Sequence, residues 1–304
     1  MKKWLPILLV VALLCGTVAA GAESARVFGI AYPIIHPFFE GTTQGAQDAA
    51  AELGIELIVK GPDRADVQQQ IEIVENMIAM KVDGIAIGPT DSMALKPLID
   101  KAMEQGIQVV TFDTDSADSA RLGYIGTDNV SAGRHMGEVL GTLLDGKGNV
   151  LVSMGVPTQQ NLKERLDGVK AVLAEKYPEI QIIDEQSGQG DPSKTLANIE
   201  DMVNAHPEFD ALIGIDAAAG PAVVTAWKAK GLTQPVIVFD DTDDILKGVR
   251  DGQITVTLAQ SQYLWGETIV KELNDACDGK EVPAFFDAGT REVNKDNIDE
   301  LYPQ

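Results

Sequence analysis

Basic residues are scarce in this sequence. Its 304 residues contain 24 lysines and arginines against 46 aspartates and glutamates, which gives a formal net charge of −22 at pH 7. A surface with this excess of acid repels a phosphate backbone, so the composition excludes nucleic acid as a partner. Hydrophobic residues still make up 45% of the chain, which is enough to build the cores of two domains of ordinary size.

Long hydrophobic runs are missing, except for one at the N-terminus. Lys2 and Lys3 precede an apolar stretch from Trp4 to Val18, and residues 20–22 (Ala-Gly-Ala) fit a cleavage signal. The stretch is too short for a comfortable membrane span. We therefore expect residues 1–22 to be an export signal that is removed from the mature protein.

Cysteine is nearly absent, because the chain holds only Cys15 and Cys277. Cys15 lies inside the expected signal, and as a lipid-anchoring site it is weak because Leu14 stands where a small residue is expected. Cys277 alone cannot form an internal disulfide. Its helical spacing from Val270 and Leu273 predicts a buried structural thiol.

Motifs for catalysis and for metal binding are also lacking. The sequence contains neither G-x-S-x-G nor H-E-x-x-H. The three histidines, His36, His135 and His206, are dispersed and have no neighbouring ligand at metal spacing. We predict no metal site and no cofactor.

What the sequence does have is a regular alternation of short apolar runs and amphipathic segments. Segments 42–53 and 67–78 repeat apolar residues at helical spacing. Strand-like runs occupy 26–32, 55–60, 83–88, 108–112, 149–154, 211–215, 236–239 and 254–259. Continuous apolar strands separated by helices indicate parallel sheets buried on both faces. There are too many units for one small sheet, so we predict an α/β fold with two doubly wound, Rossmann-like lobes.

Polar side chains follow several of these runs, at the sheet edge where ligands of open parallel sheets bind. They are Asp113, Asp216, Asp240 and Gln260, and the first run is followed by His36, Phe38 and Phe39. Carboxylates and amides suit sugar hydroxyls, which donate and accept hydrogen bonds. Aromatic faces suit the C–H side of a sugar ring. Arg165 is a candidate counter-charge for buried carboxylates.

Each residue of this set also has a simpler interpretation. An aspartate after a strand often caps the next helix, and adjacent phenylalanines often belong to the core. Arg165 could equally be a surface residue of a helix. Paired carboxylates in a cleft also occur in glycosidases.

The motifs His36-Pro-Phe-Phe39, Gly88-Pro-Thr-Asp-Ser92 and Phe239-Asp240 resemble the ribose-binding branch of type I periplasmic binding proteins. Asp128-Asn129 with Gly133, residues 205–207 (Ala-His-Pro) and Ala259-Gln260 match it too, and the resemblance covers essentially the whole mature chain. It implies two lobes joined by three hinge crossovers near residues 127–128, 260–261 and 289–290. The N-terminal lobe would contain residues 23–127 plus 261–289, and the C-terminal lobe residues 128–260 plus 290–304.

The resemblance also implies which residues bind the ligand: His36, Phe38, Phe39, Asp113, Thr114, Arg165, Gly190, Asp216, Asp240 and Gln260. His36, Thr114, Gly190 and Asp216 depart from the residues of ribose binders, which have Asn, Arg, an aromatic and Asn at these places. Sites built around particular hydroxyls reject analogues strongly. The departures therefore predict weak binding of ribose and a different sugar, polyol or aminated sugar as the ligand.

The function implied is that of a monomeric, non-enzymatic protein of the periplasm. It would close on a polyhydroxylated molecule and deliver it to the permease of an ABC transporter. An alternative is a sensor that presents its ligand to a chemoreceptor or a sensor kinase. A periplasmic glycosidase is the third possibility.

Overall fold

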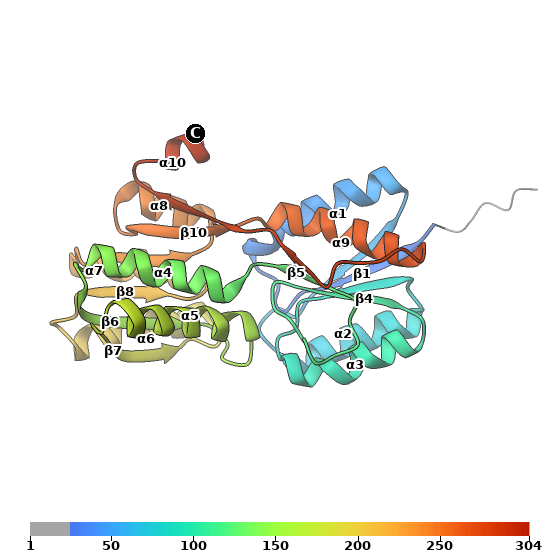
Figure 1. Cartoon of the computed structure of the whole chain (residues 1–304), viewed down its shortest axis with the longest axis horizontal. Helices are drawn as coiled ribbons and strands as arrows, with labels where there is room; N and C mark the ends of the chain where they lie inside the picture. The colour runs from blue at the N-terminus through green and yellow to red at the C-terminus, as the bar shows by residue number, and fades with distance from the viewer. Residues whose placement is uncertain (1–24, 304) are drawn as a thin grey trace, which may run out of the picture.

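The computed structural model describes residues 25–303, which form two α/β lobes lying side by side (Figure 1). The expected signal at residues 1–22, with Cys15, lies outside the described residues. The strands of the first lobe are β1 (Val27–Ala31), β2 (Glu56–Lys60), β3 (Gly84–Ile87), β4 (Gln108–Phe112), β5 (Tyr124–Gly126) and β11 (Phe285–Asp287). Its helices are η1 (Pro37–Phe39), α1 (Glu40–Leu53), α2 (Val67–Met80), α3 (Ser92–Glu104) and α9 (Gln262–Cys277).

The second lobe repeats this plan. Its strands are β6 (Lys147–Met154), β7 (Glu179–Ser187), β8 (Ala211–Gly214), β9 (Val236–Phe239), β10 (Val256–Gln260) and β12 (Thr290–Asn294). Its helices are α4 (Asn129–Leu143), α5 (Gln160–Lys176), α6 (Pro192–Ala205), α7 (Ala219–Lys230), α8 (Asp243–Asp251) and α10 (Ile298–Leu301). Within residues 25–303, no helix is long and apolar enough to cross a membrane.

Each lobe is built on one six-stranded sheet. The strand orders are β11-β5-β4-β3-β1-β2 and β12-β10-β9-β8-β6-β7, and every pairing is parallel except that of β10 with β12. In the first lobe α1 and α9 cover one face, and α2 and α3 cover the other (Figure 1). In the second lobe α4 and α5 lie opposite α6, α7 and α8. The predicted fold class, two doubly wound lobes, is confirmed.

The central strands are apolar because both of their faces are covered. Every residue of β3, β8 and β9 is buried, as expected for parallel strands between two helix layers. The sequence analysis missed the strands without such a run. β7 lies at a sheet edge, where exposed residues alternate with buried or half-buried ones, while β5 and β11 have only three residues each.

The chain passes between the two sheets three times. The passages lie between β5 and α4, between β10 and α9, and between β11 and β12. Cys277 ends α9 and is only half-buried, because its sulfur lies at the helix end beside the carbonyl of Asp83 rather than inside the core.

Candidate ligand-binding cleft

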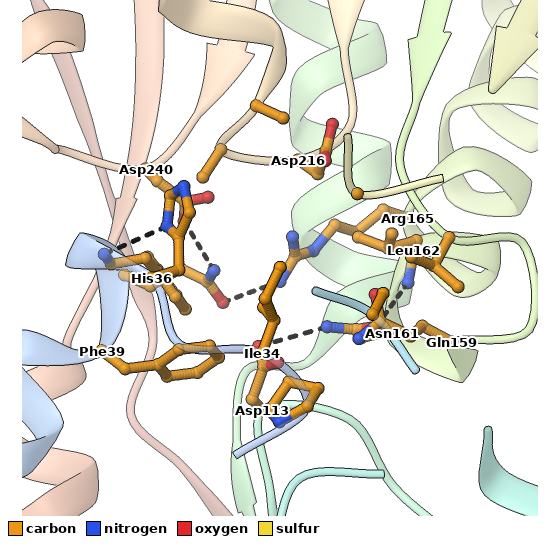
Figure 2. A pocket seen from close by; sticks show the side chains of 18 of the residues that line it. Ile34, His36, Phe39, Asp113, Gln159, Asn161, Leu162, Arg165, Asp216 and Asp240 are labelled. Carbon is orange, nitrogen blue, oxygen red and sulfur yellow. Dashed lines mark hydrogen bonds between the residues drawn. The ribbon is translucent and has the colours of Figure 1, made fainter. Parts of the chain in front are cut away.

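A cavity lies between the two lobes at the carboxyl ends of their strands. Its non-protein space amounts to about 680 Å³, part of it open to solvent. Figure 2 shows its walls converging from both lobes. It is lined by Pro33, Ile34, His36, Phe38, Phe39, Ala65, Asp113, Val156, Gln159, Asn161, Leu162, Arg165, Gly190, Pro192, Asp216, Ala217, Ala218, Asp240 and Gln260.

The structure brings all the predicted site residues to this cavity except Thr114. Thr114 is fully buried behind the wall, and its hydroxyl accepts a hydrogen bond from the backbone N–H of Asn161 at 3.4 Å. Its side chain therefore positions the opposite lobe's helix α5 instead of lining the cavity.

His36 forms one side of the cavity, in the loop after β1. Its Nδ1 accepts a hydrogen bond from the backbone N–H of Phe38 at 3.2 Å, which caps the 3₁₀ turn η1. An accepting Nδ1 places the proton of the neutral ring on Nε2. Burial lowers the pKa of His36 and keeps the ring neutral. His36 is therefore a hydrogen-bond donor at the edge of the cavity.

Phe38 and Phe39 belong both to the cavity wall and to the core of the first lobe. The Phe39 ring stacks on Tyr32 with centroids 4.6 Å apart, and Phe38 meets Trp265 edge-on at 5.8 Å. The two phenylalanine rings are themselves edge-to-face at 4.9 Å. This packing fixes the orientation of both rings, so the apolar wall is preformed.

Asp113 and Asp240 come from different lobes, and each directly follows a buried strand. Both adopt left-handed backbone conformations, with φ of 61° and 79°. For residues other than glycine this conformation is uncommon and costs free energy unless the surroundings impose it. Here the Asp113 N–H donates to Ile125 at 3.1 Å, and the Asp240 N–H donates to Leu258 at 2.8 Å. Neither residue caps a helix, so the capping interpretation does not apply to them.

Arg165 is buried in the middle of the second lobe's wall, with only 2% of its surface exposed. Its guanidinium donates to Asn129 Oδ1 at 2.9 Å, to the Ile215 carbonyl at 3.2 Å and to Gln260 Oε1 at 2.8 Å. It also lies 4.2 Å from the centre of the Phe239 ring. Within residues 25–303 Arg165 forms no ion pair, so it acts on the cavity carboxyls as a counter-charge at a distance.

Close packing of α4 on α5 places Arg165. A β-carbon added to Gly133 of α4 would lie 2.0 Å from the Arg165 carbonyl oxygen. The glycine therefore lets the two helices approach until the Asn129 amide on α4 reaches the guanidinium. This close approach of the two helices explains physically why a glycine stands at position 133, as in the family pattern.

The three cavity carboxyls have raised pKa values, and burial is the main cause in each. Burial raises the pKa of Asp113 and of Asp216 to about 6 and that of Asp240 to about 7. The nearby charge of Arg165 opposes the shift in all three without cancelling it. Removing a carboxylate from water disfavours its charged form, so these groups gain from any donor that a ligand brings.

Asp216 differs from the other two carboxyls in its hydrogen bonding. Asp113 Oδ1 accepts from Asn161 Nδ2 at 3.2 Å, and Asp240 Oδ1 accepts from Gln260 Nε2 at 2.8 Å. Asp216 Oδ1 is buried and has no partner among the described residues. Buried polar groups are rarely left unpaired, so this oxygen retains the capacity to accept one more hydrogen bond.

Sequence reasoning missed Ile34, Gln159 and Asn161, which Figure 2 places around the cavity. Asn161 stands four residues before Arg165 on α5, so both lie on the same helix face. That spacing was the available signal. Ile34 and Gln159 lie in irregular segments, where no periodicity indicates the direction of a side chain.

Hydrogen bonds connect the lobes across the cavity, which makes this a closed form. Asn161 bonds to Asp113, and the Thr158 hydroxyl donates to the Thr90 carbonyl at 3.1 Å. At the passages between the sheets, Thr127 Oγ1 donates to Gln260 Oε1 at 2.7 Å.

The remaining histidines lie elsewhere. His135 pairs with Glu292 and His206 with Asp184, each at 3.2 Å. In the part of the chain that the structure describes, no group of three or more His, Cys, Asp or Glu side chains could hold a metal ion.

A family model described as a periplasmic binding protein domain matches residues 29–281 of the chain. The chain belongs to the periplasmic binding protein family. The sequence-based resemblance to the type I branch is thereby confirmed. Family members are binding proteins, and the family's name fits an exported protein.

Relatives of this periplasmic binding protein carry names of sugar binders. The D-ribose/D-allose-binding protein of Pseudomonas aeruginosa is 31% identical over 78% of this chain and 77% of its own length. The ribose import binding protein of Bacillus subtilis is 28% identical over 83% of this chain and 82% of its own. An ABC transporter solute-binding protein of Burkholderia graminis, solved with D-arabinose, is 32% identical, covers 91% of this chain and 98% of its own, and has a TM-score of 0.87.

Proposed function

We propose that this protein captures a small polyhydroxylated molecule, a sugar or a polyol, between its lobes in the periplasm and delivers it to the permease of an ABC transporter. The single observation that carries the proposal is the cavity, where carboxylates from both lobes face an aromatic wall. Carboxylates and amides suit sugar hydroxyls, which both donate and accept hydrogen bonds. Related proteins named for D-ribose, D-allose and D-arabinose support the ligand class.

The residues that we assign to ligand binding fall into two groups. His36, Phe38, Phe39 and Asp113 belong to the first lobe, and Asn161, Arg165, Asp216 and Asp240 belong to the second. Gln260 lies at a passage between them. Since ligand contacts from both lobes stabilise the closed form, ligand binding is thermodynamically coupled to closure of the lobes. The lobes divide as residues 23–127 plus 261–289 and 128–260 plus 290–304.

The ligand leaves the protein chemically unchanged in this mechanism, and the protein acts as a monomer. Nothing in the cavity needs to form or break a covalent bond. Closed lobes present one composite surface to the permease, which distinguishes loaded from empty protein by shape.

A thermal-shift screen across pentoses, hexoses, polyols and amino sugars tests the proposal, followed by calorimetry on each hit. We expect at least one compound to stabilise the protein and to be recovered unchanged by mass spectrometry. Asp240→Asn should abolish that stabilisation, whereas Asp201→Asn, which removes the same charge from the exposed face of α6, should not. If no compound of the panel stabilises the protein, or if the protein cleaves a glycoside, the proposed function is wrong.

A further inference from the structure

The cavity holds an unbalanced set of charges. Its lining contains three carboxyl groups, one guanidinium and the neutral ring of His36. No lysine or second arginine lines it. The imbalance matters only if the single guanidinium fails to neutralise the carboxylates by contact.

Arg165 makes no such contact. Its three hydrogen bonds go to two side-chain amides and one backbone carbonyl, all of them neutral. The carboxylates in turn meet only neutral donors, namely the amides of Asn161 and Gln260 for Asp113 and Asp240. Every carboxylate of the cavity therefore lacks a cation at hydrogen-bond distance among the described residues.

Two of these carboxylates follow neighbouring strands of the second lobe. Asp216 follows β8 and Asp240 follows β9, and these strands are paired neighbours in the sheet. Figure 2 shows both at the same side of the cavity, across from Asp113. Asp216 Oδ1 is the buried acceptor without a partner. The second lobe thus contributes two carboxyl groups to the cavity lining, and Asp216 keeps an unfilled bonding position.

A hydroxyl and an ammonium group fill such a position differently. A hydroxyl supplies one hydrogen and adds two lone pairs that themselves need donors, which this side of the cavity does not provide in excess. An ammonium group supplies three hydrogens, has no lone pair and carries the missing positive charge. An uncompensated buried charge is costly, and an opposite charge in contact with it offsets that cost.

We propose that the ligand carries a protonated primary amine as well as hydroxyls, and that Asp216, together with Asp240, binds this amine. The inference rests on the proposed function and narrows its ligand to amino sugars and amino polyols. Asp113 and His36 remain for the hydroxyl groups of the ligand. Phe38 and Phe39 provide the apolar wall for its carbon skeleton.

Matched trios of ligands test the proposal, because each trio varies a single substituent. The trios are glucose, glucosamine and N-acetylglucosamine; galactose, galactosamine and N-acetylgalactosamine; and mannose, mannosamine and N-acetylmannosamine, with sorbitol and glucamine as an open-chain pair. Calorimetry at pH 7 and low salt measures each affinity. We expect the tightest ligand to be an amine that binds roughly 10- to 100-fold better than its hydroxyl and N-acetyl counterparts.

Two variants locate the amine. Asp216→Asn keeps the shape of the side chain and removes its charge, and we expect it to abolish most of the preference for the amine, measured as the ratio of the affinities of the amine and its neutral counterpart for the same variant. Asp201→Asn on the protein surface should leave the preference unchanged. An Asp216→Asn protein that still prefers the amine by the wild-type factor overturns the assignment to Asp216.

The outcomes separate this inference from the proposed function. If a neutral sugar or polyol is the tightest ligand of the panel, the proposed function stands, and the inference that the ligand carries an amine is wrong. If neither neutral nor aminated compounds bind, the proposed function fails, and the inference fails with it.

Discussion

Asn161 Nδ2 donates a hydrogen bond to Asp113 Oδ1 at 3.2 Å, and the two side chains belong to different lobes. Both are buried. The bond therefore exists only when the lobes are closed, and it holds one ligand-binding carboxylate in place. Closure and the preparation of the site are coupled through this pair.

Replacing Asn161 tests that coupling. Asn161→Ala removes a buried bond to a carboxylate, so we expect the ligand-free protein to shift toward the open form and the affinity for its best ligand to fall about tenfold. Small-angle X-ray scattering should report a larger radius of gyration. Thr158→Ala, which removes a hydroxyl that bonds a neutral carbonyl of the other lobe, should have a smaller effect. Identical scattering curves for Asn161→Ala and wild type contradict the role of this bond.

Asp240 gives the ligand-free protein an unusual dependence of stability on pH. Burial raises its folded-state pKa to about 7, whereas an unfolded aspartate has a pKa near 3.9. Between roughly pH 4 and pH 7 the folded state holds a proton that the unfolded state has released, so Asp240's contribution favours folding at low pH and is lost as pH rises through this window.

Asp240→Asn removes this contribution while preserving the acceptor for Gln260. Relative to wild type, we expect the ligand-free variant to be more stable at pH 8 than at pH 5, by about 1–3 kcal/mol in the free energy of unfolding. Urea titrations at the two pH values measure the difference. A stability difference that does not change with pH would show that Asp240 is not protonated on folding.

Arg165 holds the wall of the second lobe together. Arg165→Lys keeps the charge but cannot serve Asn129, Ile215 and Gln260 at once, because an ammonium lacks the planar fork of a guanidinium. We expect a loss of about 2–4 kcal/mol in stability and no measurable ligand binding. Arg134→Lys on α4 is the matched control, since Arg134 is half-exposed and pairs with Glu175; its cost should stay below about 0.5 kcal/mol. Equal costs for the two variants would exclude a special role for Arg165.

Ribose should bind weakly. Gly190 offers no side chain to the cavity, and a β-carbon there would lie 3.3 Å from Ala65, so this side of the site has neither an aromatic face nor space to gain one without moving the lobes. We expect ribose to bind at least about tenfold more weakly than the best ligand of the screen. Calorimetry with ribose against that ligand decides the matter, and ribose as the tightest ligand would refute the inference drawn from the altered positions.

The sequence predicted the strands that are buried on both faces, and it missed the strands that are not. β3, β8 and β9 are apolar throughout because helices cover both faces, and the polar residue after each run lies at the ligand edge by the geometry of parallel sheets. β7 is half-exposed and β12 is antiparallel, so neither produces such a run.

Within the site, the sequence did not reveal which way each side chain points or which groups it contacts. Asp113, Asp216 and Asp240 could be found because each follows a strand. The backbone alone does not reveal that Thr114 turns behind the wall, or that Arg165 bonds to amides instead of carboxylates. Those facts depend on α4, which is brought against α5 by Gly133, a contact between segments far apart in the chain.

The left-handed backbone at Asp113 and Asp240 restricts how ligand preference can diverge among descendants of this protein. Aspartate, asparagine and glycine are the residues that tolerate such a conformation at small cost. Larger or branched replacements at these two positions would damage folding before they changed the ligand. New specificities would therefore arise at positions such as Ile34 and Gln159, which line the cavity without that backbone constraint.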